Sequence, residues 1–578
     1  MTLLSCRAAL LAALFPPVAV AQSPDNVLLI IADDVGVDGI SCYGLGASPP
    51  PTPNVDALAQ RGVRFTNAHS CPTCSPTRAS LMTGRHGFRT GVGVALGIGD
   101  AGLAGNELLI PELLRPAGIR SALFGKWHLG DDLGAATPTG EGLDEFAGTI
   151  QGGVLDYYQW PKVTAGHYGI STTYSTTDIV DDAVAFVAAA SGPWFLVVSF
   201  HAAHVPLDAP PATLHSQNLA GLDPQSTPVP FFEAMVEAMD SEIGRLLGAL
   251  SPTTAARTNV VFLGDNGPAG LTVEPPFDPD RSKGTVYQGG VRVPLIVAGP
   301  AVQGTPRVES GLVHAVDLFP TLLAMQGVAA PVSTPAGPVD GVSFVPLLQA
   351  AGQPAVRDYV YTQQFVGAAA MTVAGDQEMI RDRTHELLRF RQPDGTVREE
   401  LYDLANDPWE QSDLLALPAT GAVRDVYRRL FGELAQLRGY PAALPYGNGC
   451  SGAGAVPVLA AIDAPVYGAT FHMRVTGLAG ASAATFGVLG LGDESWLGLP
   501  LPADLGAFGM PGCSALVEPL SVRLLAQSPL SANWPEPLPN DVGLVGLGFF
   551  AQALALVPGA NAAGALTSAA LQVVIGMP

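Results

Sequence analysis

Cys74 begins a stretch of sequence that favours a helix. Pro76 suits the first position of a helix, Ser75 suits the cap before it, and the residues that follow can extend it. We therefore expect Cys74 at a helix N-terminus, where unpaired N–H groups and the helix dipole attract anions. Arg78 adds a positive charge one turn later. For an arbitrary Cys-x-x-Cys pair such as Cys71 with Cys74, a structural or disulfide-bonded cysteine is the alternative.

Oxygen-bearing side chains follow two apolar segments. Asp33 and Asp34 come after one, and Asp265 and Asn266 come after the other. Carboxylate and amide oxygens are ligands for hard cations such as Ca²⁺ or Mg²⁺, and zinc is disfavoured because these four residues include no His or Cys. Taken singly, Asp-Asp after a strand is commonly a solvated turn, and Asp-Asn-Gly is a common turn sequence. At the ends of two predicted core strands they form a candidate metal site.

Lysine is rare in this chain, so each lysine calls for an explanation. Of 28 basic residues, only Lys126, Lys162 and Lys283 are lysines. Lys126 and His128 are two residues apart and would point to one side of an extended segment, although an isolated Lys-Trp-His is more often a surface turn. A guanidinium fork does not readily replace a compact, titratable ammonium, which suggests that the chain keeps lysine where it needs that group.

Four apolar segments are predicted to be buried parallel strands: residues 26–32, 120–124, 194–200 and 259–263. Each is followed by polar residues, and the segment after residue 200 contains His201 and His204. In an open α/β sheet, ligands bind at the carboxyl ends of the strands, so this edge is the predicted site. Helices predicted at residues 56–61, 231–250 and 315–326 are assigned to core packing, because 231–250 carries apolar residues at helical spacing.

The chain of 578 residues is too long for one core and divides by composition. Residues 22–354 are the predicted α/β catalytic domain. Short strands at 359–361, 386–390 and 400–402 and a helix at 422–437 predict a small antiparallel α+β subdomain over 355–440. A Pro/Gly-rich boundary over 441–449 then leads into a segment with few charges and many short apolar runs. That segment, 447–578, predicts an accessory β sandwich.

Composition also limits the partners and the location. The formal net charge of −23 argues against non-specific nucleic-acid binding. Residues 1–21 combine Arg7, an apolar run and Ala-Val-Ala, which predicts a secretory signal peptide cleaved after Ala21 and a secreted, periplasmic or cell-surface protein. The longest later apolar tract, near 542–557, is too short and interrupted to span a bilayer.

Export permits disulfides, which bears on the remaining cysteines. Cys450 and Cys513 lie in one C-terminal segment and are the plausible pair. Cys42 and Cys71 are then expected to be free.

The motif around Cys74 resembles the signature of the sulfatase family. Cys74-x-Pro-x-Arg is followed by Leu81, Thr83, Gly84 and Arg85, and in that family the cysteine is oxidised after translation to Cα-formylglycine. Segments 125–130, 283–290 and 401–408 resemble further sulfatase stretches, so the resemblance extends over about residues 25–440. The chain departs from the pattern at Gly264, where a small hydroxyl residue is frequent, and at Gln288, where Glu is frequent. A substrate contact expected around 148–153 has no clear match.

The resemblance implies an alkaline-phosphatase-like α/β fold, modification by the formylglycine-generating enzyme, and a sulfated small molecule or glycan as substrate. It implies a metal site for Ca²⁺, in preference to Mg²⁺, because four protein ligands, an aldehyde-hydrate oxygen and a substrate oxygen make a six- or sevenfold shell. The implied metal ligands are Asp33, Asp34, Cys74, Asp265 and Asn266. The implied catalytic residues are Cys74, Arg78, Lys126, His128, His204 and Lys283.

By the same resemblance, one hydroxyl of the formylglycine hydrate attacks sulfur with Asp265 as base, and the cationic residues neutralise the sulfuryl oxygens. Lys283 or His204 protonates the leaving oxygen, and His128 accepts the proton of the second hydroxyl when sulfate is expelled. Two alternatives remain. One is a phosphodiesterase or phosphonate monoester hydrolase of the same superfold, and the other is a catalytically silent protein that binds sulfated glycans.

Overall fold

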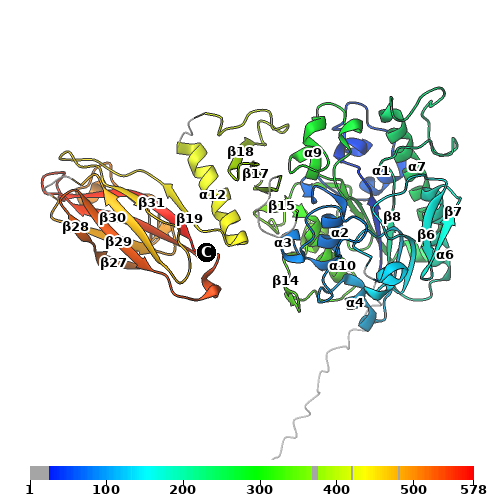
Figure 1. Ribbon diagram of the computed structural model, residues 1–578, viewed down its shortest axis with the longest axis horizontal. Coiled ribbons are helices and arrows are strands. Elements are labelled where there is room, and N and C mark those ends of the chain that lie inside the picture. Colours follow the sequence, from blue (N-terminus) through cyan, green and yellow to red (C-terminus); the bar gives the residue numbers. More distant parts are fainter. Residues whose placement is uncertain (1–24, 132, 367–374, 418–420, 479–481) are drawn as a thin grey trace, which may run out of the picture.

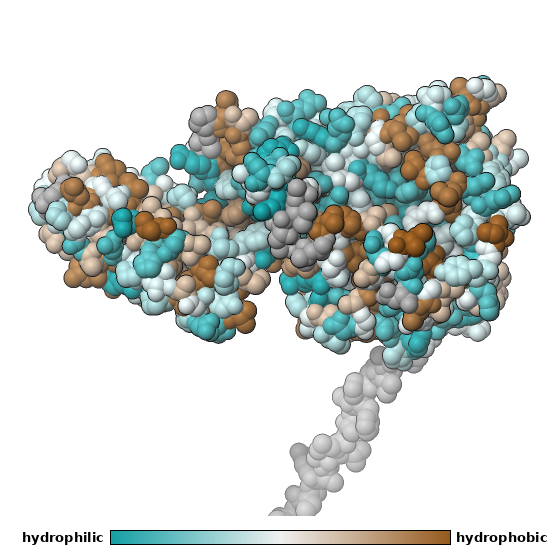
Figure 2. Space-filling model, viewed as in Figure 1, coloured by the Kyte–Doolittle hydropathy of each residue, from teal (hydrophilic) through white to brown (hydrophobic). Residues whose placement is uncertain are grey.

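The computed structural model describes residues 25–131, 133–366, 375–417, 421–478 and 482–578. The predicted signal peptide lies outside these residues. Figure 1 shows a large α/β body, helix α12 beside it, and a β sandwich beyond that helix. Figure 2 shows the same molecule as two lobes joined through a narrower middle region.

The large lobe is built on a ten-stranded sheet with the order β11-β2-β10-β9-β1-β8-β4-β5-β6-β7. Strands β9, β1, β8, β4 and β5 run parallel, whereas β10 is antiparallel to both of its neighbours. The bounds are β1 Asn26–Ala32, β2 Gly62–Phe65, β4 Arg120–Lys126, β5 Glu145–Thr149, β6 Trp160–Thr164, β7 His167–Ser171, β8 Trp194–Ser199, β9 Thr258–Gly264, β10 Leu295–Ala298 and β11 Arg307–Glu309.

The four predicted apolar strands are confirmed as β1, β4, β8 and β9, and they are neighbours in the centre of the sheet. Every residue of β1 is buried because both faces of the sheet are covered by helices. Leu28 and Ile30 pack in one cluster with residues of α1, α6 and α7. Leu29 and Ile31 pack in a second cluster with residues of α2, α4 and α10. The predicted α/β class, with helices on both faces of a mostly parallel central sheet, is thereby confirmed.

The helices of these layers are α1 Pro53–Gln60, α2 Cys74–Thr83, α4 Ile110–Leu114, α6 Ser175–Ala189, α7 Pro228–Ala249 and α10 Leu318–Met325. The predicted helix at 231–250 is α7, which begins three residues earlier at a proline suited to a first turn. The predicted helix at 315–326 is a 3-10 turn, Ala315–Asp317, followed by α10.

The smaller subdomain is a four-stranded antiparallel sheet covered by α12, Gly421–Arg438. Its strands are β15 Val360–Gln364, β16 Gln377–Arg381, β17 His385–Arg391 and β18 Val397–Asp403. Strand β16 was not predicted from the sequence. Leu430 and Leu434 of α12 pack against Ile380, Leu387 and Leu401 of the sheet, which gives this subdomain its own core.

The C-terminal region is a sandwich of a five-stranded sheet, β19-β31-β30-β22-β27, and a four-stranded sheet, β20-β21-β29-β28. In β21, Phe471, Met473 and Val475 are buried and the residues between them are exposed, as a sheet with one packed face requires. The strands are β19 Ala442–Tyr446, β20 Val458–Ala461, β21 Thr470–Thr476, β22 Ala484–Gly490, β27 Ser521–Leu524, β28 Ala526–Ser528, β29 Ser531–Pro537, β30 Gly548–Leu556 and β31 Ala565–Val574. The Cys450–Cys513 disulfide is present, and Cys42, Cys71 and Cys74 are free thiols.

The expected boundary at 441–449 contains a strand. Strand β19 pairs antiparallel with β31, so the sandwich begins before residue 447. Proline is compatible with this edge position, because an edge strand leaves N–H groups unpaired. Ala435 of α12 also packs with Ala442 and Val574 of the sandwich, and Arg428 Nη1 of α12 lies 3.0 Å from Asp493 Oδ2. The smaller subdomain and the sandwich therefore share a small core.

Within the described residues, no helix is long and apolar enough to cross a membrane.

Candidate active site

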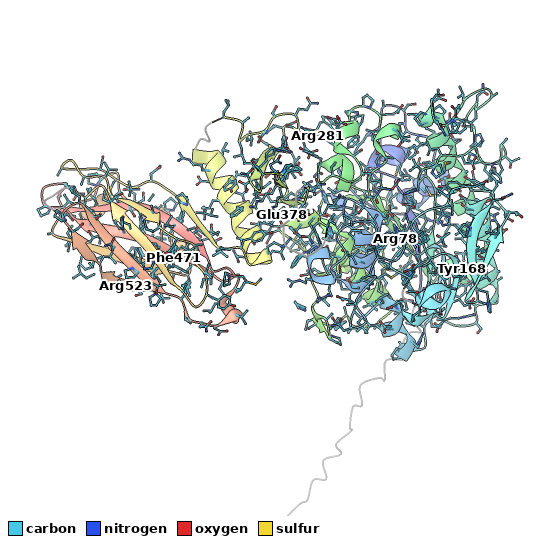
Figure 3. All side chains as sticks on the ribbon, in the orientation of Figure 1. Arg78, Tyr168, Arg281, Glu378, Phe471 and Arg523 are labelled. Carbon is cyan, nitrogen blue, oxygen red and sulfur yellow. A yellow bond between two sulfur atoms is a disulfide. The ribbon has the colours of Figure 1, made fainter. Side chains whose placement is uncertain are left out.

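The carboxyl ends of β1, β9, β4 and β8 meet at one place in the large lobe. Asp33 follows β1, Asp265 follows β9, and Lys126 ends β4. Backbone bonds fix this edge: Asp265 N donates to Ala32 O at 3.1 Å, and Ala203 N donates to Asp33 O at 2.7 Å. Figure 3 places Arg78 in the interior of the same lobe. The site therefore lies where an open α/β sheet places its ligands.

Cys74 is the first residue of α2, with Thr73 at the cap position. The prediction that Ser75 caps the helix was wrong by two residues. The Ser75 hydroxyl instead accepts a hydrogen bond from Leu96 N at 3.0 Å and so holds a neighbouring loop. Cys74 is buried, and burial raises the pKa of its thiol. An unmodified Cys74 is therefore a protonated thiol, a poor nucleophile at neutral pH.

The predicted metal ligands lie together. The Cys74 sulfur and one carboxylate oxygen each of Asp33 and Asp265 lie within 4.8 Å of one another. Asn266 Nδ2 donates to Asp34 Oδ1 at 2.7 Å, and Asp34 N donates to Asp265 Oδ1 at 3.2 Å.

Two oxygen atoms in this cluster, Asp33 Oδ1 and Asn266 Oδ1, are buried and have no hydrogen-bond partner among the described residues. Buried oxygens are costly unless a donor or a cation satisfies them. An oxygen-rich donor set with free lone pairs suits Ca²⁺ or Mg²⁺.

Each carboxylate of the cluster is paired with one cation. Lys126 Nζ lies 2.5 Å from Asp33 Oδ2, and both side chains are fully buried. Lys283 Nζ lies 2.6 Å from Asp34 Oδ1. Arg78 Nη2 lies 2.8 Å from Asp265 Oδ2. The three pairs neutralise one another, so a bound divalent cation would make the site positive and suited to an anionic substrate.

The pKa values of Asp33 and Asp265, the two carboxyls beside Cys74, are shifted in opposite directions. Burial alone would raise the pKa of Asp33, but the charges of Lys126, His204, Arg78 and Lys283 hold it well below its usual range. Burial, followed by the charge of Asp33, raises the pKa of Asp265 to about 6. Such a divergence between neighbouring carboxyls is typical of catalytic sites, where one group stays ionised and the other can accept or release a proton.

His128 presents a free ring nitrogen beside this cluster. Its Nε2 lies 2.8 Å from Leu96 O, and because a carbonyl only accepts, Nε2 carries the proton. Nδ1 is then the unprotonated nitrogen, and it is buried with no partner among the described residues. Burial, with the charge of Lys126, holds the pKa of His128 well below its usual range. The ring is neutral and able to accept a proton at Nδ1.

Gly152 and Gly153 form the wall beside the two histidines. A Cβ on Gly152 would lie 2.3 Å from His128 Cε1, and one on Gly153 would lie 3.3 Å from His204 Nδ1. His204 Nε2 lies 3.9 Å from Asp34 Oδ2, and its side chain is partly exposed. Gly152 and Gly153 belong to the stretch 148–153, in which no substrate contact could be matched from the sequence. Their backbone lies against the rings of His128 and His204. A side chain at residue 152 has no room.

The structure therefore brings all the sequence-predicted site residues into one cluster. His201 had only weak support from the sequence as a site residue, and its contacts are structural. Its Nε2 lies 2.8 Å from Thr149 Oγ1, and the ring packs beside Trp160.

The departures from the family pattern leave the cluster intact. A Cβ on Gly264 would lie 2.2 Å from Val35 O, so a hydroxyl residue does not fit there in this chain. The Gln288 side chain donates to Glu386 Oε2 at 2.7 Å and accepts from Arg381 Nη1 at 3.0 Å, and neither partner is a predicted metal ligand.

Sequence reasoning missed the residues that hold the site in place. Ser199 Oγ lies 2.6 Å from Arg78 Nη1 and donates to Lys126 O at 2.7 Å. Gln377, on the unpredicted strand β16, donates from Nε2 to Gly284 O at 2.7 Å and accepts at Oε1 from Val286 N at 3.3 Å. Its side-chain amide therefore holds the loop that carries Lys283 at two backbone positions, Gly284 and Val286. The only available signal for Ser199 was its position at the end of an apolar strand, and Gln377 had none.

Comparison with known proteins gives a consistent assignment. The sulfatase family model matches residues 25–328, and a second model, N-sulphoglucosamine sulphohydrolase, C-terminal, matches residues 280–439. Human arylsulfatase A is 29% identical over 469 residues, covering 73% of this chain and 89% of the relative. A sulfatase from Formosa agariphila is 29% identical over 482 residues, covering 68% of this chain and 85% of the relative.

The crystal structure of Ps i-CgsB is 26% identical with a TM-score of 0.61, and the match covers 72% of this chain and 93% of that one. The sulfatase model spans more than half of this chain and includes every residue of the cluster. The chain therefore belongs to the sulfatase family, whose members hydrolyse sulfate esters.

Proposed function

We propose that this protein is an exported sulfatase that acts on an aryl or carbohydrate sulfate through Cα-formylglycine at position 74 and a bound Ca²⁺ ion. The observation that carries the proposal is the buried cluster in which Cys74 lies against Asp33 and Asp265. A structural cysteine would not require two buried ion pairs and a third, partly exposed pair around it. A buried, protonated thiol would also be a poor nucleophile, which favours modification of the residue.

Asp33, Asp34, Asp265, Asn266 and residue 74 would hold the cation, which would polarise the sulfate oxygens. A formylglycine hydrate would supply two hydroxyls on one carbon, one to attack sulfur and one whose loss of a proton expels sulfate. Unmodified cysteine or serine has no second hydroxyl on that carbon.

The chain's own residues then have separate roles. Lys126, Arg78, Lys283 and His204 neutralise charge on the sulfuryl oxygens. Asp265, which has a carboxylate oxygen within 4.8 Å of the residue 74 sulfur position, takes the proton of the attacking hydroxyl. Lys283 or His204 protonates the leaving oxygen, because both lie on the more open side of the cluster beside Asp34.

His128 accepts the last proton at Nδ1. Its Nε2 is committed to Leu96 O, so the ring cannot turn that nitrogen towards the substrate without losing this bond. The same bond fixes the tautomer that the role requires.

The direct test is to produce the protein with and without the formylglycine-generating enzyme. The peptide containing residue 74 should lose about 18 Da on conversion, and hydrolysis of 4-nitrophenyl sulfate should rise with the converted fraction. Full activity in protein whose Cys74 is entirely unmodified would overturn the mechanism. Cys74→Ala, made with the converting enzyme present, is the matched inactive control.

The same preparation separates the alternatives. A phosphonate monoester hydrolase or phosphodiesterase would turn over an aryl phosphonate or phosphodiester faster than the aryl sulfate. A silent glycan-binding protein would release no sulfate from any ester.

Export and the sandwich are further parts of the proposal. A mature N-terminus at Gln22, found by sequencing the protein from the medium or periplasm, would support cleavage after Ala21. None of the proposed catalytic or metal-binding residues lies beyond residue 283, so we assign the accessory domain, predicted at 447–578, to retention or targeting and not to chemistry.

A further inference from the structure

Three loops touch the two histidines of the site and form its rim. Residues 91–106 reach His128 through Leu96 O. Residues 150–159 reach both histidines through Gly152 and Gly153. Residues 202–215 carry His204 itself. These loops therefore border the two histidines on the outer side of the reacting centre.

None of these three loops contains a lysine or an arginine. A fourth loop, residues 268–287, contains Lys283 and Arg281. The Arg281 guanidinium lies 4.5 Å from the Tyr287 ring centroid and its Nη1 donates to Glu410 O, so it is engaged with the smaller subdomain. Among the described residues of these four loops, Lys283 is therefore the only Lys or Arg that pairs with a carboxylate of the reacting centre.

Acidic residues occupy the rim instead. Asp156 is three residues after Gly153, and Asp208 is four residues after His204. Four residues span at most about 14 Å, so Asp208 lies near the cluster. The Tyr158 hydroxyl donates to Ala209 O at 2.9 Å and ties the two loops together.

The two acids are close enough to influence each other. Burial raises the pKa of Asp208, and the charge of Asp156 raises it further. Asp156 is exposed and Asp208 half-buried, so both carboxylates reach solvent from the loops that carry Gly153 and His204.

Apolar side chains complete the rim. Ile98 is 85% exposed and Leu155 is 93% exposed, and each lies two or three residues from the backbone that touches His128. Exposed aliphatic side chains beside a site favour contact with an apolar or uncharged group.

We propose that the substrate carries one sulfate group on an uncharged, partly apolar alcohol, and that Asp156 and Asp208 select against polysulfated chains. The inference rests on the proposed sulfatase activity. Within the cluster, three cations balance three carboxylates, so a divalent cation leaves the positive charge that a single sulfate ester needs. A second sulfate that lies over these three loops would meet carboxylates and no Lys or Arg side chain of the loops themselves.

The test compares a monosulfated saccharide with its disulfated counterpart on converted, calcium-loaded protein. Wild-type kcat/KM should be higher for the monosulfate. In Asp156→Asn/Asp208→Asn protein, the ratio of disulfate to monosulfate kcat/KM should rise roughly three- to tenfold at low salt. Asparagine keeps the side-chain oxygen that accepts from Tyr158 N in one loop and from Ala209 N in the other, so the loops should keep their shape. Added salt should shrink the difference between wild type and variant.

Asp394→Asn is the matched control. Asp394 also accepts from a backbone N–H two residues later, but it lies in the hairpin between β17 and β18. That substitution should leave the ratio unchanged. A wild-type preference for the disulfate, or an unchanged ratio in the double variant, would overturn the inference.

Binding separates this inference from the function on which it rests. Calorimetry with Cys74→Ala protein should show weaker binding of the disulfate than of the monosulfate, with the gap closing in the Asp156→Asn/Asp208→Asn background. If no sulfate ester is hydrolysed while this binding order holds, the proposed chemistry is wrong and the rim selectivity stands. If turnover occurs and the binding order is reversed, the rim selectivity is wrong and the chemistry stands.

Discussion

Replacing Gln377 with alanine should impair catalysis by loosening the loop that carries Lys283. The Gln377 amide makes one short bond to Gly284 O, at 2.7 Å, and one longer bond from Val286 N, at 3.3 Å. Gly284 is partly exposed and water can reach it, whereas Val286 is buried. The substitution therefore removes about 1 kcal/mol of net hydrogen bonding and leaves one buried N–H unpaired at about 1 kcal/mol more.

A loss of about 2 kcal/mol in holding the loop corresponds to a drop of roughly 10- to 30-fold in kcat/KM if the loop must be ordered for turnover. Gln377→Glu keeps the acceptor for Val286 N and loses the donor to Gly284 O, so its activity should fall between wild type and alanine. Gln364→Ala is the matched control. Gln364 lies opposite Gln377 in the β15–β16 register, and no hydrogen bond from its side chain to the loop is found among the described residues.

The assay is kcat/KM on two sulfate esters with different leaving groups, together with the melting temperature. If Lys283 protonates the leaving oxygen, the alanine variant should lose more activity on an alkyl sulfate than on 4-nitrophenyl sulfate, whose leaving group needs no proton. An equal loss on both esters would refute the link to Lys283 and would leave His204 as the proton donor. A loss that follows the melting temperature in all three variants would show that Gln377 only stabilises the fold.

Four further predictions follow from the same geometry. Lys126→Arg and Lys283→Arg should each lower kcat about 100-fold or more. Lys162→Arg should stay active, because the Lys162 ammonium pairs with carboxylates of α6. Equal activity in the three variants would contradict a special role for lysine. Exhaustive chelation should abolish turnover and Ca²⁺ should restore it better than Mg²⁺, and activity unchanged by chelation would count against the metal site. Burial, then the charge of Glu386, raises the pKa of Glu410 well above its ordinary 4.5, so the stability it contributes is complete below pH 4.5 and is lost as the pH rises. Glu410→Gln should reduce the fall in melting temperature between pH 5 and pH 8 by about 1 °C per kcal/mol recovered, and an unchanged fall would refute this assignment. Removing the sandwich should expose the apolar residues of α12 that pack against it, and should lower the melting temperature. The remaining folded protein should keep its turnover of a small sulfate ester. Loss of that turnover in folded protein would show that the sandwich completes the site.

The sequence alone determined the parts of this protein that depend on local pattern. Continuous apolar runs specify buried strands, and β1, β4, β8 and β9 lie where those runs predicted them. The polar residues that end these runs reach one edge because parallel strands share a direction. The motif that begins at Cys74 also predicted the family, since its residue types and spacing are read along one helix and its cap.

The tertiary structure decided what depends on contacts between distant segments. Lys126 pairs with Asp33, which is 93 residues away, and Lys283 pairs with Asp34, which is 249 residues away. Those pairings follow from the order of strands in the sheet, which local pattern does not encode. Strand β19 forms within a Pro/Gly-rich stretch because β31 offers it an edge, a contact that overrides local propensity.

Gln377 and Ser75, which support the site, also owe their roles to the tertiary structure. Gln377 could not be recognised from its sequence neighbourhood, because β16 gave no clear strand pattern and the amide acts on a loop 93 residues away. Ser75 was assigned to a cap from its type, yet the fold uses its hydroxyl to hold Leu96 and, through Leu96, the ring of His128. Residue types and spacing therefore predicted which groups gather at the candidate site, whereas the packing of distant segments determined how those groups are paired, oriented and held.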